Sequence, residues 1–194
     1  EKWEEYQNIV ELVLTIEPEN YELLCNLAIV NKESGNTEEA MNYINRALSI
    51  DDKNTRGLII AGEILLKPAD DILEEMNSLG YSRKEEIKYD ELKKQREVVI
   101  RESIAYFEKA FNISEEALIR NPRSSSAMLN YIVSAWKLGK KEDAKWQMEE
   151  LILNSNNLFL NKNNFVTRIN NYPWHQVNKD LVISVYDEIR EDGS

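Results

Sequence analysis

The chain has 194 residues, 42% of them apolar and 30% charged, so it can bury a substantial core, and this composition argues against wholesale disorder. One cysteine cannot close an intrachain disulfide, and together with one histidine it cannot supply the soft ligands of a zinc site. The net charge of -11 repels a phosphate backbone, which argues against nucleic acid as the main partner.

Neither a membrane span nor a secretory signal is evident in these residues. No apolar run approaches the roughly 20 residues that a spanning helix needs, and the chain opens on the charged segment Glu1-Lys2-Trp3-Glu4-Glu5. We therefore expect no membrane insertion, and the absence of a signal favours the cytoplasm. Because residue 1 is not Met, the presence of a signal or anchor upstream stays open.

Glycine and proline are scarce, with six and four residues, fewer than a turn-rich β protein needs. Apolar residues recur at spacings of three and four, which is typical of helices with one buried face. The sequence therefore predicts an all-α chain.

Residues 20–48 predict two short antiparallel helices. The segment Ser34-Gly35-Asn36 separates them, with Gly35 at the C-terminal cap of the first helix and Thr37 as the cap of the second. The first helix carries the apolar residues Leu23, Leu24, Leu27 and Val30. The second carries Ala40, Tyr43, Ile44, Ala47 and Leu48 on one face.

One helix pair of this size cannot bury its apolar faces without stacking on similar pairs. The positions expected to pack against neighbouring helices, which we call slots, are Leu24, Leu27, Ala28, Gly35, Ala40, Ile44 and Ala47. On these residues the segment 21–54 resembles the tetratricopeptide repeat, departing from it at Asn31, where Tyr is usual, and at Asp52, where Pro is usual. A shift of 34 residues places Pro18-Glu19-Asn20 on Asp52-Lys53-Asn54, so residues 1–20 look like the second helix of a partial repeat.

Two further copies of the pattern follow. The third begins at Thr55 and has the first-helix slots Leu58, Ala61, Gly62 and Leu65. A later copy begins at Ser125 and is broken at Leu138-Gly139-Lys140. Its slots are Met128, Tyr131, Ile132, Ala135, Ala144, Met148 and Leu151. The resemblance is specific over residues 1–65 and 121–156.

The intervening segment departs from the repeat pattern. Pro68 predicts a helix end at Lys67, followed by a short helix over Ala69–Leu79 that Gly80 closes. The residues Ser82-Arg83-Lys84-Glu85 have the spacing of a capping box, and no Gly or Pro follows before Pro122. This predicts one helix from about Arg83 to Arg120, roughly 55 Å long. The alternative is a degenerate repeat with a turn near Arg101.

At the C-terminal end we expect a helix over 157–171, a break at Pro173, and a last helix from about His175 to Arg190 that caps the stack. The predicted organisation is thus a partial repeat (1–20), a repeat (21–54), a repeat with an insertion and a long helix (55–124), a repeat (125–156) and capping helices (157–194). The predicted fold is all-α, an antiparallel helix-pair solenoid forming a right-handed superhelix.

No arrangement of residues predicts catalysis, because nothing supplies a nucleophile together with a base and an orienting group. His175, beside a helix start, is interpreted as a capping or surface residue. Cys25, within an apolar helix, is interpreted as a packed or groove-lining thiol. The acidic pairs are interpreted as solvated helix faces. We expect no metal and no cofactor.

The resemblance implies a concave wall of first helices that binds an extended peptide or a partner helix. The groove slots expected to contact the partner are Cys25, Ile29, Lys32, Ile59, Glu63, Leu129, Val133 and Trp136. Their apolar centre favours a hydrophobic peptide or an amphipathic helix. A clamp for chaperone tails is rejected, because only Asn26 and Asn130 occupy a related slot and the required lysines are missing.

The sequence thus predicts a non-catalytic scaffold with a protein or peptide partner. Most of the net negative charge lies in residues 1–54, where it would steer a basic partner, although solubility explains it equally well. Two alternatives remain: a self-associating structural subunit, with the long helix as a homodimer element, and a regulatory repeat domain of a larger protein. The groove could instead be filled by residues 68–82, by the end helix or by a second copy.

Overall fold

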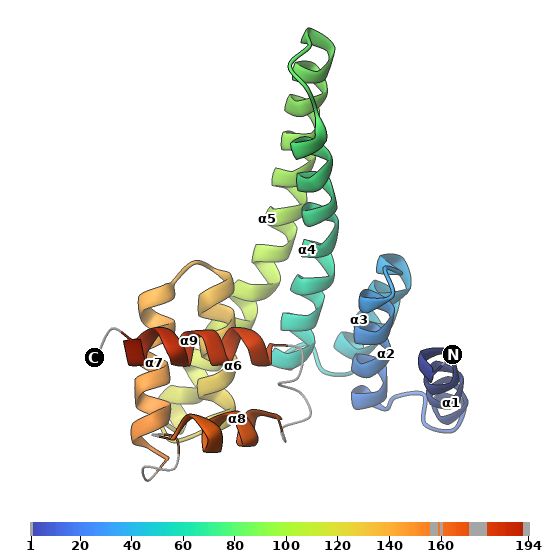
Figure 1. Ribbon diagram of the computed structural model, residues 1–194. Helices are drawn as coiled ribbons and strands as arrows, with labels where there is room; N and C mark the ends of the chain where they lie inside the picture. The colour runs from blue at the N-terminus through green and yellow to red at the C-terminus, as the bar shows by residue number, and fades with distance from the viewer. Residues whose placement is uncertain (1, 156–158, 160, 171–177, 192–194) are drawn as a thin grey trace. The chain divides into compact units, whose positions relative to one another are not determined.

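The computed structural model describes residues 2–155, 159, 161–170 and 178–191. Within these ranges the regular secondary structure is helical throughout, which confirms the predicted all-α fold built from antiparallel helix pairs (Figure 1). The chain divides into two compact units, Glu1–Tyr106 and Phe107–Ser194, and the boundary falls within the fifth helix.

The first unit is a succession of antiparallel helices. Helix α1 packs against α2, α2 against α3, and α3 against α4, and α2 also packs against α4. The helices are α1 (Lys2–Ile16), α2 (Tyr21–Glu33), α3 (Thr37–Ile50), α4 (Thr55–Ser78) and the first part of α5 (Arg83–Arg120). This order gives each helix pair the neighbour that it needs to bury its apolar face.

The core of the first unit uses the slots predicted from the repeat pattern. Small residues alternate with large ones, so that neighbouring helices approach closely and the side chains interdigitate. Completely buried members are Leu24, Leu27, Ala28, Ala40, Ile44, Ala47 and Ala61. In α4 the neighbouring Ile64 is completely buried, whereas the predicted slot Leu65 is only half-buried. From α1, Val10 and Leu14 join the same cluster.

The turn between α2 and α3 depends on Gly35. Its φ of 79° lies in the left-handed region that side chains disfavour, as predicted for this cap. The Asn36 amide donates to the Asn31 carbonyl at 2.8 Å, which gives this carbonyl in the last turn of α2 a hydrogen-bond partner. The assignment of Thr37 as the cap of α3 is wrong, because Thr37 is already helical and Asn36 precedes it at the cap position.

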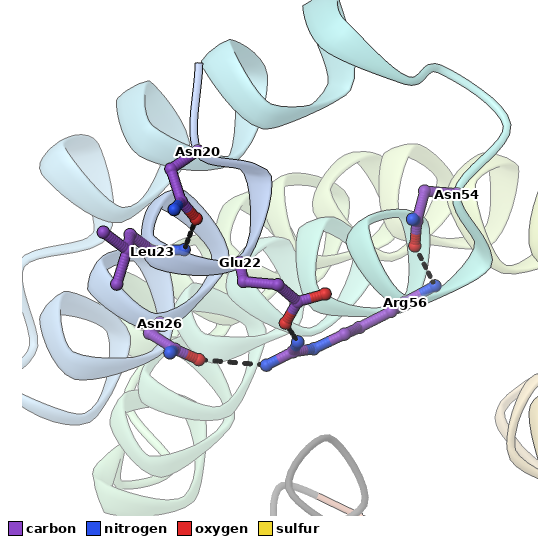
Figure 2. A network of polar contacts seen from close by, with 6 residues as sticks. All are labelled: Asn20, Glu22, Leu23, Asn26, Asn54 and Arg56. Atoms are coloured by element: carbon purple, nitrogen blue, oxygen red, sulfur yellow. Dashed lines mark hydrogen bonds and ion pairs between the residues drawn. The ribbon is translucent and has the colours of Figure 1, made fainter. Parts of the chain in front are cut away.

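Helices α2 and α4 both begin with an asparagine that caps the helix through its side chain. The Asn20 side chain accepts a hydrogen bond from the Leu23 amide at 3.1 Å, and the Asn54 side chain accepts one from the Arg56 amide at 3.2 Å (Figure 2). Each bond satisfies an amide that has no partner within its helix. The two asparagines stand 34 residues apart, so the repeat extends to the helix caps.

The predicted helix end at Lys67 is wrong, because α4 continues through Pro68 to Ser78. A proline inside a helix costs roughly 3 kcal/mol, since it removes one hydrogen bond and crowds the preceding turn. Contacts with α5 oppose this cost: Arg96 Nε donates to the Ala69 carbonyl at 3.2 Å, and Lys88 pairs with Glu75 at 2.6 Å. The first part of α5 thus runs back along α4 and holds it helical beyond the proline (Figure 1).

The predicted long helix is present as α5, without a turn near Arg101. Its start is the predicted capping box: the Glu85 amide donates to Ser82 Oγ at 3.3 Å, and the Ser82 amide donates to Glu85 Oε2 at 3.0 Å. The Gly80 amide also donates to Glu85, at 3.1 Å. The hydrogen bonds from Ser82, then from Gly80, lower the pKa of the Glu85 carboxyl.

The second unit joins the end of α5 to a helix pair and two C-terminal helices. The pair is α6 (Ser125–Lys137) and α7 (Lys141–Leu153), which turn at Gly139 with a φ of 75°, as predicted. Helix α9 (Lys179–Glu191) packs against both members of the pair, and α8 (Lys162–Asn170) packs against α9.

The two C-terminal helices are shorter than predicted. Helix α8 begins at Lys162 rather than residue 157, and α9 begins at Lys179, whereas His175 and Pro173 lie outside the described residues. A stack of the Phe165 and Tyr186 rings, with centroids 4.4 Å apart, ties α8 to α9. Asparagine-rich sequence before Lys162 explains the late start, since Asn side chains compete with helical hydrogen bonds.

Gly57 provides a test of close packing in the first unit. A Cβ at this position would overlap the Tyr21 hydroxyl and come within 3.0 Å of Leu48. Alanine favours a helix over glycine by about 1 kcal/mol, but overpacking costs about 1–3 kcal/mol. We expect Gly57→Ala to lower the free energy of unfolding in urea.

The matched control for this prediction is Gly57→Ala combined with Tyr21→Phe. Removal of the hydroxyl relieves the overlap, so the double variant should recover much of the lost stability. Equal losses in the single and double variants would contradict the proposed contact.

Candidate partner-binding surfaces

The five groove residues predicted in the first unit differ in their accessibility. Cys25 and Ile59 are buried, so their side chains form packed structure rather than open surface. Ile29 is half-buried and packs against the core cluster. Lys32 is half-buried and Glu63 is buried, and these two form an ion pair.

A polar contact joins equivalent slots of consecutive helix pairs. Arg56 at the start of α4 reaches Glu22 and Asn26 on α2 (Figure 2). Glu22 and Arg56 are 34 residues apart, and the Arg56 Nη2 donates to Asn26 Oδ1 at 3.0 Å. Arg56 is only 9% exposed, and these contacts hold its guanidinium in a fixed position.

The Arg56 Nε is buried and lacks a hydrogen-bond partner within the described residues. A buried donor without an acceptor carries an unfavourable desolvation free energy of about 1–3 kcal/mol.

A second ion pair lies at the other end of α2. Lys32 Nζ is 3.4 Å from Glu63 Oε2 and 3.1 Å from Glu33 Oε1. The Glu63 residue is only 8% exposed, and the ion pair offsets part of the desolvation cost of burying a carboxylate. On α2, Ile29 stands three residues from both Asn26 and Lys32, which places it between the two polar contacts.

We call this surface the α2–α4 face and define it by the residues Glu22, Asn26, Ile29, Lys32, Arg56 and Glu63. Its charged groups are held by contacts within the protein, and its apolar contribution is one half-buried side chain. Such an arrangement provides fixed hydrogen-bonding and apolar contacts without any reactive group.

Cys25 lies beneath this face. Burial raises the pKa of its thiol to about 11, against the smaller opposing effects of the Tyr21 hydroxyl and of Arg56. Burial also raises the pKa of the Tyr21 hydroxyl, with the nearby Cys25 as the next cause. A neutral, inaccessible thiol supports the interpretation of Cys25 as a packing residue.

The three groove residues predicted in the second unit are on α6. Val133 and Leu129 are buried, and Leu129 lines a pocket of about 270 Å³ with Phe159 and Ile169 from the C-terminal part of the chain. Trp136 is half-buried, and Lys141 Nζ lies 5.0 Å from its ring centroid. Within this unit Trp136 is therefore the most accessible of the predicted contacts.

The second unit also has a pocket that the sequence analysis did not identify, which we call the Trp146 pocket. It has a volume of about 280 Å³ and lies among α5, α6 and α7. Its lining is Glu115, Leu118, Ile119, Pro122, Met128, Tyr131, Trp146, Gln147 and Glu150. The sequence feature that could have indicated this pocket is Trp146, a large aromatic residue outside the packing slots of the repeat.

Metal sites and membrane spans are both absent from the described part of the chain. No group of three or more His, Cys, Asp or Glu side chains there could hold a metal ion. None of the helices in those same ranges has the length and apolar character needed to cross a membrane.

Residues 21–54, which are α2 and α3 with the linker that follows, match the tetratricopeptide repeat family. A search of curated proteins finds no match to the chain. Among solved structures the chain is similar to a thermophilic TPR protein from Thermus thermophilus, with 14% sequence identity and a TM-score of 0.49. That alignment covers 97% of this chain and 82% of the other.

The raised pKa of Cys25 predicts slow alkylation. At about pH 8 the folded chain should hold roughly one thousandth of the thiol as thiolate, so iodoacetamide should label it far more slowly than in denaturant. Mass spectrometry of labelled protein measures both rates. Rapid labelling of the folded chain would contradict a packed, neutral thiol.

Proposed function

We propose that this chain, which carries a tetratricopeptide repeat at residues 21–54, is a non-catalytic interaction module that binds a polypeptide segment on its α2–α4 face. Tetratricopeptide repeats generally mediate protein–protein interaction. We infer the choice of face and the chemistry of the partner from the contacts described above.

The ordered guanidinium of Arg56 carries this proposal. Glu22 and Asn26 fix it in place, and the Arg56 side chain stays 11% exposed. A carbonyl or carboxylate oxygen of a bound segment would gain a charge-assisted hydrogen bond from this guanidinium. Because the guanidinium is already immobilised, binding requires little further loss of side-chain entropy.

The apolar contact of the proposed site is Ile29. An extended peptide presents backbone carbonyls and alternate side chains, so one oxygen can meet Arg56 while an apolar side chain packs on Ile29. Cys25 and Ile59, which were predicted to contact the partner, are buried. In this proposal they pack beneath the α2–α4 face and do not touch the bound segment. Lys32 and Glu63 bound the face at its other end.

Trp136 offers a further anchor on the second unit, backed by the buried residues Leu129 and Val133. Tryptophan contributes a large apolar area and is enriched among residues that dominate binding energies. The proposal includes no metal, cofactor or nucleic acid, and it assigns Cys25 to packing because its thiol is inaccessible and neutral.

A test uses peptides selected on the wild-type chain from a displayed library of random dodecapeptides. Fluorescence anisotropy then measures their affinity for Ile29→Glu and Ile29→Ala. Charge on Ile29 should weaken binding about 10-fold or more, with a smaller loss for alanine, because both remove apolar contact and only one buries a carboxylate.

The control is Ile50→Glu, which places the same charge on an exposed isoleucine of α3. Circular dichroism establishes that each variant is folded. Unchanged affinity in both Ile29 variants, with the fold intact, would exclude the α2–α4 face as the binding site.

Self-association is a second candidate function, and α1 supports it. Ile9, Leu12 and Ile16 recur at spacings of three and four, and all three side chains are exposed. An exposed apolar stripe on a helix is a typical surface for a second helix. A second copy of this chain would bury it in an isologous interface.

Sedimentation over a range of protein concentrations tests this candidate. Association through α1 predicts a mass that rises with concentration and returns to that of the monomer in Leu12→Glu, because a buried charge opposes the interface. Asn42→Glu, on the exposed surface of α3, is the matched control and should associate like the wild type. A wild-type chain that is monomeric at all concentrations would exclude self-association.

A further inference from the structure

The Trp146 pocket combines an apolar interior with an acidic rim. Met128, Gln147 and Tyr131 are buried and form its floor. Trp146 and Ile119 stand at its walls, 58% and 76% exposed. Glu115 from α5 and Glu150 from α7 complete the lining on the two helices that flank α6.

The floor of the pocket is held rigid by aromatic packing. The Tyr131 ring lies 4.6 Å from the Phe111 ring, centroid to centroid, and the two planes are tilted by 39°. The Phe111 ring also contacts a cation, because Lys140 Nζ lies 3.8 Å from its centroid. Pre-organised aromatic walls reduce the entropy that a ligand must lose on binding.

The electrostatic environment of the pocket is negative. Burial raises the pKa of the Tyr131 hydroxyl, and the charges of Asp143 and Glu115 raise it further. Within the described residues, neither Glu115 nor Glu150 forms an ion pair. The pocket therefore presents unneutralised carboxylates beside an exposed indole.

Two basic residues close in sequence to the lining form ion pairs elsewhere. Arg120 Nη2 pairs with Glu116 at 3.2 Å, on the adjacent face of α5. Lys145 Nζ pairs with Glu188 of α9 at 3.3 Å. Neither of these two cations pairs with Glu115 or Glu150, so a cation of another molecule can take that place.

We propose that the Trp146 pocket binds an arginine side chain of a partner protein, with the aliphatic stem on Leu118 and Trp146 and the guanidinium between Glu115 and Glu150. A guanidinium stacks on an indole and donates to carboxylates in a fixed planar geometry, which suits this lining better than a compact ammonium does. The volume of about 280 Å³ fits a side chain rather than a larger ligand.

This site is separate from the α2–α4 face in both residues and chemistry. Its lining lies entirely in the second unit, and its selectivity arises from charge rather than from an apolar contact at Ile29. The two proposals can therefore fail independently.

The experiment is an NMR titration of the full chain with capped tripeptides, Ala-X-Ala, in which X is arginine, lysine, citrulline or norleucine. Citrulline has nearly the shape of arginine but no charge, and norleucine retains only an aliphatic stem. The readout is the indole N–H signal of Trp146, assigned as the signal that Trp146→Phe removes from the four tryptophans.

The arginine peptide should saturate this signal with a dissociation constant on the order of 1 mM, and citrulline should bind about 10-fold more weakly. The double variant Glu115→Gln and Glu150→Gln should weaken arginine binding by a similar factor. Its matched control is Glu116→Gln with Glu149→Gln, which changes the net charge equally through neighbouring exposed carboxylates.

Several outcomes would overturn the proposal. Equal affinities for arginine and citrulline would show an uncharged contact, and equal losses in the two double variants would show attraction to net charge alone. Absence of any saturable shift would exclude the site. Retention of arginine binding in Ile29→Glu is expected and separates this result from the test of the α2–α4 face.

Discussion

Close contact between neighbouring helices of the first unit is the constraint on which the rest of its structure depends. Ala28, Ala40, Ala47 and Ala61 are completely buried, and Gly57 leaves no room for a Cβ beside Tyr21. Small side chains at these crossings let large neighbours such as Leu24 and Ile44 fill the remaining space. The same approach of α2 and α4 brings side chains from equivalent slots within bonding distance.

That approach explains why the α2–α4 face is polar as well as apolar. Charged residues cannot be buried between helices unless they find partners, and Arg56 and Glu63 find them on α2. The Arg56 side chain remains 11% exposed beside these partners. An interaction module needs a surface that is ordered before binding yet retains bonding capacity, and this face combines the two properties.

The two candidate surfaces follow from different features of the helix pairs. The α2–α4 face is formed by the first helices of consecutive pairs, at slots that repeat every 34 residues. The Trp146 pocket instead uses the end of α5 and the outer surface of α7, with α6 beneath them. Apart from the packing slots Met128 and Tyr131, its residues share no period, because the repeat pattern leaves the outward positions of each helix unconstrained.

Local signals in the sequence determined most of the helices, the cap at the start of α5 and the resemblance of residues 21–54 to the tetratricopeptide repeat. Gly35 adopts the left-handed backbone expected at its predicted cap, and Gly139 lies at the predicted break between α6 and α7. Ser82 and Glu85 begin α5 as the predicted capping box, because these effects act within a few residues. Tertiary structure decided that α4 continues through Pro68, where contacts with α5 outweigh a local cost. It also decided that Cys25, Ile59, Leu129 and Val133 are buried and that three helices converge on Trp146, since burial depends on neighbours that no local pattern specifies.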